Sequence, residues 1–510
     1  MEVGESADRE WKERYFFACS YQDVLDKYNG MRAKTPLWDK TPYAINPKPL
    51  DEYLTARGGA GLISRVFRGL RLPGVCLANL GELRKHAKGF ECWQMVESID
   101  TGVLLGAERV EDLDQLRQDE GVAKLLGYVP PSARTVRDFL EKFHDEDGYQ
   151  RARQSAQAQG RLAFIPEATK GLAGLTTVLG ASARATASQG PGVRWATIDQ
   201  DATITESWKR AALWTYEKVK GYQPMVAVWA EADAVVAAEF RDGNVPAGMS
   251  PLSCCQQAFV ALPPGLDGYA YRGDSACHEW DLLNWLRDEN RPGGPQGRIE
   301  FAVSAKMSEP LHQASVKLPE KRWTTLGQPE ADGTVRQWAE LDFVPTEPSE
   351  KKQTQPLRYI GIRVVKAQGE FFEDGTRAKH FAVISNRRER GDWIVNWHRQ
   401  KAGTVEHVHD ELKNGLAAAA PPSQLFGANA AWFLINCIGY NLTSALRATA
   451  PDSNLRTARL KQLRFRVLHV AARVARDRRK WSVRFAASVE WVRQLRRWFA
   501  IFVLKTQPTG

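Results

Sequence analysis

Several features that would place a chain in a common class are missing from this sequence. The seven cysteines among its 510 residues are scattered, form no C-x-x-C pair and show no metal-ligand spacing, so neither a disulfide framework nor a zinc module is expected. No run of about 18 uninterrupted apolar residues occurs, which argues against a membrane-spanning helix. The opening stretch, MEVGESADREWKERYFF, is charged and has no apolar signal core. We therefore expect a soluble cytoplasmic protein with no membrane partner.

Negative charge is scarce in the C-terminal part of the chain. Residues 456–510 carry 15 Lys or Arg against Asp477 and Glu490, an excess of 13, while the rest of the chain has 55 basic and 58 acidic residues and the net charge is +10. Self-repulsion on this scale favours an anionic partner, and nucleic acid is the natural one in the cytoplasm. A solvated basic face or a membrane surface is the alternative. The apolar residues of this tail recur at helical spacing: Leu460, Leu463, Val467, Val470, Ala471 and Val474.

No internal repeat divides the chain, but its texture changes along the length. Residues 1–190 lack strong β-patterning, and the runs at 110–127 and 130–148 have helical apolar spacing, the second with the stripe Val136, Phe139, Leu140 and Phe143. These two runs could form a DNA-reading unit, although an ordinary helical hairpin is the simpler interpretation. The stretch ASQGPGVRW then has the composition of a linker.

From residue 191 the pattern becomes three strands, helix, strand, helix, strand, which predicts a mixed α/β layer structure. Gly-rich turns, the polar run PTEPSEKKQTQP and strand-like pieces such as RYIGIRVVK then indicate a β-rich insertion. We accordingly predict the following parts: a mostly helical N-terminal region (1–190), a first part of an α/β core (191–305), the insertion (306–394), a second part of the core (395–450) and a basic helical tail (451–510).

Acidic residues stand at three separated positions of this α/β region. Asp201 lies near the end of the first strand with Asp199 on the same face, Asp274 follows the strand YAYRG, and Glu406 lies on the helix after the insertion. Collected together, such carboxylates would hold one or two Mg²⁺ ions and a phosphate substrate. Lys413 shares a helix face with Glu406 and could contact a DNA phosphate. Helix capping by Asp274 and ordinary surface charge at Glu406 are the alternatives.

The sequence resembles the DDE transposases of bacterial insertion sequences, group one. The blocks that carry the resemblance are long and in order: ATIDQDAT, KGYQPMVAVWAEADAVVAAEFRDGNVPAG, YRGDSACHEWDLLNWL, AGTVEHVHDELKNGL and PPSQLFGANAAWF. It implies an RNase H-like core interrupted by a β insertion, with metal-binding D, D and E at Asp201, Asp274 and Glu406, and with Asp199 as the alternative to Asp201. The related Y-x-x-R-x-x-x-E-x-x-x-x-x-x-K motif keeps only its last two positions, Glu406 and Lys413.

The first two positions of that motif are Arg399 and Ala402 here, so Lys401 or Arg399 would have to supply the missing charge. The resemblance implies an enzyme that cuts and joins DNA strands with two Mg²⁺ ions, for which Mn²⁺ is expected to substitute. Its implied partners are double-stranded DNA, as terminal inverted repeats and target, and a second copy of the chain on paired ends, in the bacterial nucleoid. Trp323 and Trp338 are candidates to stack on an unpaired base, with core packing as the alternative. An inactive DNA-binding relative, or a nuclease without strand transfer, is the competing function.

Overall fold

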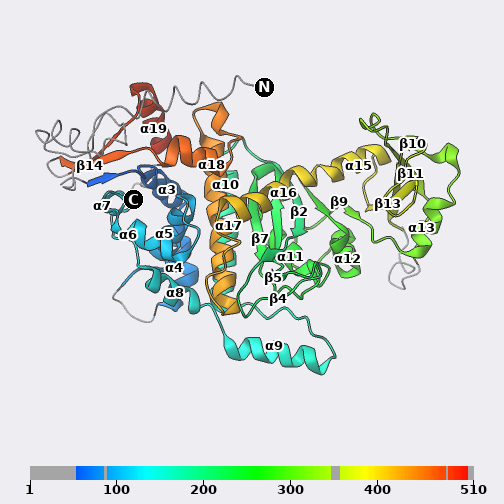
Figure 1. Cartoon of the computed structure of the whole chain (residues 1–510), viewed down its shortest axis with the longest axis horizontal. Coiled ribbons are helices and arrows are strands. Elements are labelled where there is room, and N and C mark those ends of the chain that lie inside the picture. The colour runs from blue at the N-terminus through cyan, green and yellow to red at the C-terminus, as the bar shows by residue number, and fades with distance from the viewer. Residues whose placement is uncertain (1–52, 85–88, 346–355, 478–479, 503–510) are drawn as a thin grey trace, which may run out of the picture. The chain divides into compact units, whose positions relative to one another are not determined.

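The computed structural model of the chain describes residues 53–84, 89–345, 356–477 and 480–502 (Figure 1). The charged N-terminal stretch, Cys19 and most of the polar run PTEPSEKKQTQP lie outside the described residues. The six cysteines within them are free and buried. Among the helices that the structure describes, none has the length and apolarity needed to span a bilayer.

Helices dominate the region before residue 190. A short strand β1 (Tyr53–Thr55) precedes α3 (Ala60–Gly69), α4 (Leu72–Leu80), α5 (Cys92–Leu104), α6 (Leu113–Gln118), α7 (Glu120–Leu126), α8 (Ala133–Glu141), α9 (Glu146–Ala158) and α10 (Lys170–Ala187). The helical spacing predicted at 110–127 is confirmed, but the run breaks into separate helices. Asp119 causes the break because its carboxylate accepts the Val122 N–H and so begins α7.

The predicted helix after residue 130 is confirmed as α8. Ser132 caps it by accepting the Thr135 N–H, which satisfies one of the free donors at the helix start. The side chains of the expected apolar stripe are all buried: Val136, Phe139, Leu140 and Phe143. This face packs against the long helix α17 (Phe426–Thr449). The proposed DNA-reading role of this unit stays a prediction.

Helix α17 joins the helical region to the sheet. Nearly all of its 24 residues are buried, polar ones such as Asn436, Asn441 and Arg447 included, which makes it a core helix. It packs against α10, α5 and β7 (Ala234–Glu239), and α10 also packs against β7 (Figure 1). Asn441 fixes this contact, since its amide exchanges hydrogen bonds of 2.8 Å with both the N–H and the C=O of Val235.

A nine-stranded sheet forms the α/β region. Its order is β10-β11-β12-β13-β9-β8-β2-β6-β7, in which only β2–β8 and β8–β9 are parallel. The strands before the insertion are β2 (Trp195–Ala202), β6 (Met225–Trp229), β7, β8 (Gly268–Gly273) and β9 (Ile299–Ser304), with α11 (Pro251–Ala261) and α12 (Trp280–Arg287) between them. The predicted order of three strands, helix, strand, helix, strand is therefore confirmed for these main elements.

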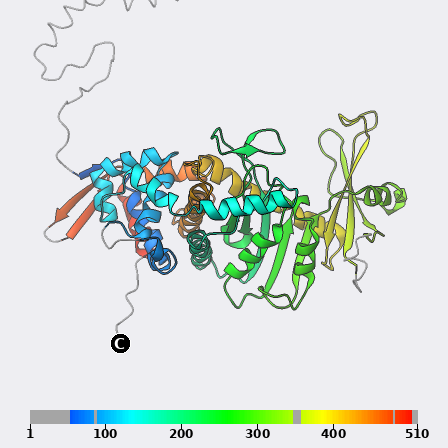
Figure 2. The ribbon, with the colours of Figure 1, turned by 90° about the horizontal axis from the view of Figure 1, so that it is seen from below.

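Residues 306–394 are rich in strands, but those strands are not a separate sheet. They comprise α13 (Glu309–Val316), β10 (Thr324–Thr325), β11 (Val335–Leu341), β12 (Arg358–Val365) and β13 (Ala378–Ser385). The antiparallel pairing of β13 with β9, at Val383↔Ser304, extends the core sheet outward (Figure 2). The chain returns through α15 (Gly391–Arg399) and α16 (Lys401–Asp410). The proposed domain boundaries themselves stay predictions.

The expectation that the tail is helical throughout is wrong between residues 472 and 485. After α18 (Leu460–Leu463), two strands form, β14 (Ala472–Asp477) and β15 (Lys480–Phe485), and α19 (Val489–Ile501) follows. Ala472 and Val474 are buried while Arg473 between them is exposed, a two-residue period that suits a strand. β14 pairs with β1 from the other end of the chain, which no local pattern in the tail could reveal.

Candidate active site

Asp201 and Asp274 lie at the same edge of the sheet. Their strands, β2 and β8, are parallel neighbours with Gln200 opposite Gly273, so the next residue of each strand is an aspartate. Parallel strands end together, and ligands in α/β sheets bind outside those carboxyl ends. The fold thus brings together the first two of the three acids that the sequence analysis selected.

Lys401, the first residue of α16, is the cation that meets this pair. Its Nζ lies 3.0 Å from Asp201 Oδ2, and its side chain is only 11% exposed. Burial lowers the pKa of Lys401, but the charges of Asp201 and Asp274 outweigh burial and raise this pKa above its ordinary value. The ammonium is therefore positively charged and neutralises part of the charge of the two carboxylates.

Asp274 both caps a helical turn and faces Asp201. One of its oxygens, Oδ1, accepts the Ala276 N–H at 3.0 Å, which is the capping role considered from the sequence. Burial, and then the negative charge of Asp201, raise the pKa of Asp274, although Lys401 and backbone N–H groups act in the opposite direction. A neighbouring carboxylate thus disfavours the ionisation of Asp274.

Asp199 forms an ion pair with a different cation, Arg272. The guanidinium donates from Nε to Oδ1 at 2.6 Å and from Nη2 to Oδ2 at 2.8 Å, and the Thr404 hydroxyl also donates to Oδ2. Both side chains are buried. A buried carboxylate with each oxygen already bonded has little capacity left for a metal ion. Asp199 and Asp201 thus have different environments despite lying on one face of β2.

The end of β8 is held by the junction of α15 and α16. Arg272 also donates from Nη1 to the Trp397 carbonyl at 2.8 Å and lies over the Trp397 ring at 5.2 Å. His398 is buried, and its Nε2 lies 2.9 Å from the Gly273 carbonyl. Burial lowers the pKa of His398 to about 4, so the neutral ring donates this bond at neutral pH. These contacts fix the backbone that presents Asp274.

Glu406 and Lys413 lie on the helix that carries Lys401, but in different surroundings. Val405, Val408 and Leu412 are buried, and α16 packs on β2 and β6 through this face. Glu406 is exposed; it lies about 140° around the helix from Lys401, given 3.6 residues per turn. No three His, Cys, Asp or Glu side chains converge as a metal-binding group within the described residues. The role of Glu406 as third metal ligand therefore stays a prediction.

Lys413 and His409 lie nearer the aspartates. Burial lowers the pKa of Lys413, while the charges of Glu217, Glu206 and Asp201 partly oppose this shift, so its ammonium lies within electrostatic reach of Asp201. Burial also lowers the pKa of His409 to about 4, with Asp201 opposing. Neither ring nitrogen of His409 has a hydrogen-bond partner, an unusual condition for a buried imidazole.

Arg272 and Thr404 are the supporting residues that the sequence analysis did not identify. A signal for Arg272 was present: Asp199 precedes Asp201 by two residues, and Arg272 precedes Asp274 by two. When two parallel strands are aligned at their ends, the residues two positions earlier also lie opposite each other, as Asp199 and Arg272 do. Thr404 had no such signal, because its partner lies 205 residues away.

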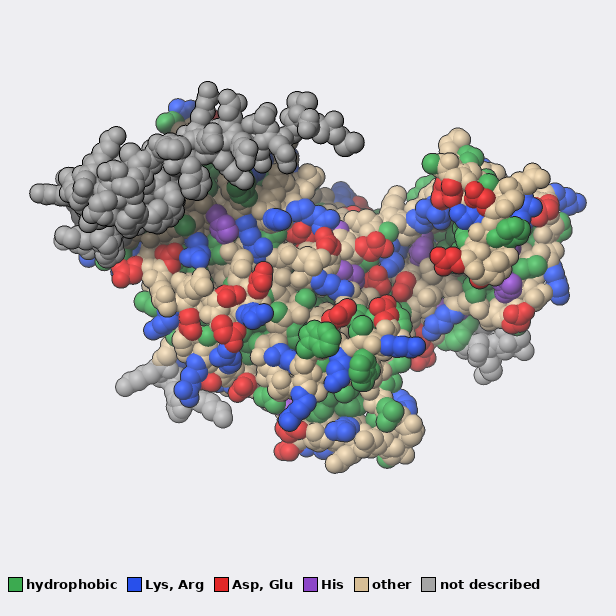
Figure 3. All heavy atoms as spheres, in the orientation of Figure 1, with side chains coloured by type: hydrophobic (Ala, Val, Ile, Leu, Met, Phe, Trp, Pro, Cys, Tyr) green, Lys and Arg blue, Asp and Glu red, His purple; other side chains and the backbone are tan. Residues whose placement is uncertain are grey.

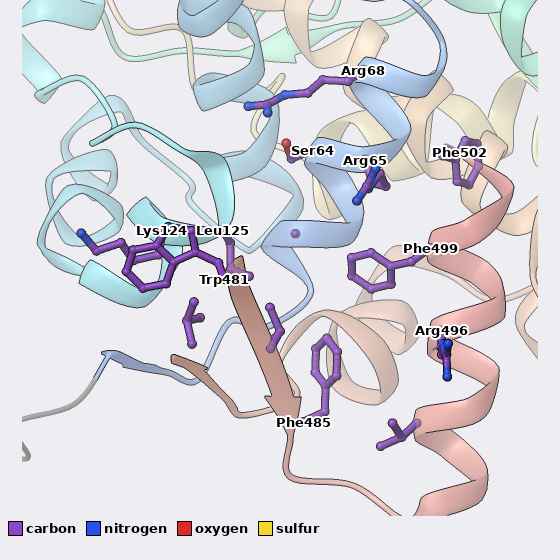
Figure 4. Close-up of a pocket in the computed structure, with 14 residues that line it drawn as sticks. Ser64, Arg65, Arg68, Lys124, Leu125, Trp481, Phe485, Arg496, Phe499 and Phe502 are labelled. Atoms are coloured by element: carbon purple, nitrogen blue, oxygen red, sulfur yellow. The ribbon is translucent and has the colours of Figure 1, made fainter. Parts of the chain in front are cut away.

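A separate pocket of about 590 Å³ lies between the helical region and the tail (Figure 4). Aromatic side chains of the tail line it, namely Trp481, Phe485, Phe499 and Phe502, together with Arg65 and Arg68 of α3. Arg68 is already bonded to Glu97 at 2.8 Å. The pocket shares no residue with the aspartate pair.

Comparisons with known proteins give two findings. A family model described as "Transposase DDE domain group 1" matches residues 52–506. Among solved structures, the chain is similar to a piggyBac transposase in a cryo-EM structure of a synaptic complex with hairpin DNA, at 9% identity and a TM-score of 0.39, covering 81% of this chain and 79% of that one. No curated protein sequence matches the chain.

Proposed function

Because the chain belongs to the family of transposase DDE domains, group 1, we propose that it cleaves DNA at the ends of an insertion sequence and transfers the freed strand to a target, in a metal-dependent reaction. The observation that carries this proposal is the pairing of Asp201 with Asp274 at the ends of β2 and β8. We propose further that β2, β6, β7, β8 and β9 are the RNase H-like core expected from the resemblance.

The residues at this edge fit a divalent cation in part. Asp201 and Asp274 offer carboxylate oxygens, the ligands that Mg²⁺ and Mn²⁺ prefer. Among the described residues, Lys401 is the one cationic side chain that bonds to this pair, and it relieves the repulsion between the two carboxylates. Glu406, exposed on α16, is proposed as the third ligand from the family resemblance alone. Bound there, two Mg²⁺ ions would activate a water or hydroxyl oxygen and stabilise the leaving oxygen of an in-line displacement.

The side chains around the aspartates have distinct tasks in this proposal. Arg272 neutralises Asp199 and so keeps β2 and β8 in register at the reacting end. Lys401 neutralises part of the charge of Asp201 through their 3.0 Å contact and so competes with a metal ion for this carboxylate. Lys413 contacts a DNA phosphate, a task suited to a flexible ammonium on the rim of the site. Asp199 is structural, so Asp201 is the ligand of the first strand.

The basic tail is proposed to grip the DNA backbone, but some of its arginines already serve the fold. Arg464 donates to the carbonyls of Leu104 at 2.8 Å and Gly415 at 2.6 Å, and Arg466 pairs with Asp452 at 2.8 Å. Arg496 and Arg497 on α19 are better placed for phosphates, in contacts that carry little sequence information. A homodimer on paired DNA ends is proposed from the family resemblance alone.

Cleavage by purified protein tests the proposed function. The substrate is a plasmid that carries the DNA flanking the coding region, with its terminal inverted repeats, and the reaction contains Mg²⁺ or Mn²⁺. Asp201→Asn and Asp274→Asn should each lower the cleavage rate by about a thousandfold, because the lost metal ligand is worth several kcal/mol in the transition state. Asp267→Asn, an exposed change just before β8, is the matched control and should retain full activity.

Glu406→Gln tests the third acid, with Asp410→Asn one turn further along the same helix as its control. If Glu406→Gln is as active as Asp410→Asn, Glu406 is not a metal ligand. Full activity in Asp274→Asn would overturn the proposed function. The joined products separate the competing functions: a nuclease cuts without joining the freed end to target DNA. An inactive relative binds the repeats and produces neither product.

A further inference from the structure

A small sheet stands directly beside the aspartate pair. Residues 203–222 leave β2 immediately after Asp201 and form β3 (Thr205–Glu206), β4 (Leu213–Trp214) and β5 (Lys220–Tyr222), in the order β3-β5-β4. We call this segment the aromatic hairpin. A hydrogen bond of 3.0 Å from the Thr203 N–H to the Pro224 carbonyl closes its base, so it is fixed at the edge of the sheet that carries Asp201 and Asp274.

The aromatic hairpin has an inverted pattern of burial. Its buried residues are the small or polar Thr205, Ser207, Ala212 and Thr215, together with Tyr222 at its base. Its outward positions are large rings, with Trp208 94% exposed, Tyr216 71% and Trp214 62%. Trp214 lies on β4, whereas Trp208 follows β3 and Tyr216 follows β4, so the segment exposes rings from one strand and two connections. Such a patch on a protein surface marks a binding site more often than chance exposure.

Cations surround these rings. Lys209, Arg210, Lys218 and Lys220 outnumber Glu206 and Glu217 in the hairpin, giving it a net charge of +2, and Lys220 Nζ lies 5.8 Å from the centre of the Trp214 ring. Figure 3 shows a hydrophobic patch over β4 and β5 with Lys and Arg side chains beside it. Exposed aromatic faces interleaved with cations are the combination that binds single-stranded nucleic acid.

The hairpin also faces the aspartates. Slight burial, then Glu217, and then the charges of Asp274 and Asp201 raise the pKa of Tyr216, so its hydroxyl lies within electrostatic reach of both carboxylates. The two tryptophans considered from the sequence are less suited to this task. Trp323 is buried against Arg363 and His380, and Trp338 packs against the small core cluster that includes Ile394.

We propose that the aromatic hairpin binds unpaired nucleotides of the DNA end beside the aspartate pair, with bases stacked on Trp208, Trp214 and Tyr216 and phosphates met by the neighbouring cations. This inference rests on the proposed function, because it assumes that DNA ends reach the two aspartates. It concerns single strands specifically, since the base faces in a duplex are covered by their neighbours and offer no surface for a ring.

Binding without catalysis tests the proposal. The full chain, in EDTA so that no DNA is cut, is titrated into a fluorescein-labelled 12-nucleotide dT strand and into a 12-base-pair duplex, with anisotropy as the readout. Trp208→Ala should weaken binding to the single strand about tenfold, within the range that one stacked base contributes, and should leave duplex binding unchanged. Trp208→Phe should recover most of the loss. Arg210→Gln should weaken both and reduce the salt slope by about one.

Phe371→Ala is the matched control, because Phe371 is 63% exposed and belongs to the β12–β13 connection. It should bind both probes as the parent does. Equal losses for strand and duplex in Trp208→Ala, or no loss in a variant with all three rings replaced by Ala, would overturn the proposal. So would a shift in oligomeric state with unchanged strand binding, which would make the patch a contact between protein chains.

The design separates this inference from the proposed function. Asp274→Asn, which should lower the cleavage rate by about a thousandfold, should still show ring-dependent binding of the single strand in EDTA. A parent protein that never cleaves but shows the ring-dependent binding leaves the hairpin inference standing and overturns the function. If the variant with all three rings replaced cleaves DNA and binds the single strand as the parent does, the proposed function stands and the hairpin inference is overturned.

Discussion

The buried pair of Asp199 and Arg272 gives a quantitative prediction about stability. Their side chains are 0% and 4% exposed, and two hydrogen bonds of 2.6 and 2.8 Å join them. Arg272→Met would leave the carboxylate buried with Thr404 as its remaining side-chain donor. Removing one partner of a buried pair costs about 3–5 kcal/mol, because the other charge loses its partner without regaining water.

A second change separates the lost pair from the buried charge. Asp199→Leu combined with Arg272→Met removes both charges, and an apolar replacement of similar volume is often close to neutral. We therefore expect the double variant to be more stable than Arg272→Met alone by at least about 2 kcal/mol, even though it carries Asp199→Leu as an additional substitution.

The chain contains a matched control for this experiment. Arg194 and Asp267 form the same two-bonded geometry, at 2.6 and 2.8 Å, and are also 73 residues apart. They lie at the opposite end of the same two strands, where both are exposed. Water and salt screen such a pair, so Arg194→Met should leave the free energy of unfolding nearly unchanged.

Urea unfolding followed by far-UV circular dichroism measures these differences, with the free energy taken from the transition that reports the sheet. Two results would refute the reasoning. Arg272→Met could lower the free energy of unfolding no more than Arg194→Met does, in which case burial does not determine the strength of the ion pair. The double variant could be less stable than Arg272→Met, in which case the unpaired charge is not the source of the loss.

Two further predictions concern charged groups near the sheet. Burial raises the pKa of Asp242 to about 6, although the hydrogen bond from the Tyr149 hydroxyl, at 2.7 Å, opposes this shift. Between the unfolded pKa of Asp242 and about pH 6, the folded state keeps a proton on this carboxyl that the unfolded state has lost. The free energy of unfolding therefore falls as the pH rises through this range. Asp242→Asn should therefore gain about 2 kcal/mol over the parent between pH 4 and pH 7, and a constant difference in urea titrations would contradict this. Lys401→Met removes the cation that competes for Asp201 and should tighten Mn²⁺ binding severalfold by calorimetry; weaker binding would mean that Lys401 organises the site for the metal.

The sequence by itself determined the elements that depend on short-range periodicity. The alternation of strands and helices from residue 191 and the stripe on α8 follow from patterns within about ten residues, where side-chain period and backbone geometry are directly linked. The positions of Asp201 and Asp274 at strand ends follow in the same way, and parallel pairing then brings them together.

Only the tertiary structure decided which distant groups meet. Arg272 pairs with Asp199 across 73 residues, Lys401 meets Asp201 across 200, and β14 leaves the helical pattern to pair with β1. The exposure of Trp208, Trp214 and Tyr216 belongs to the same class, because it depends on which residues of the hairpin pack inward. Such contacts depend on packing summed over the whole chain, and several alternatives are equally compatible with any local stretch of sequence.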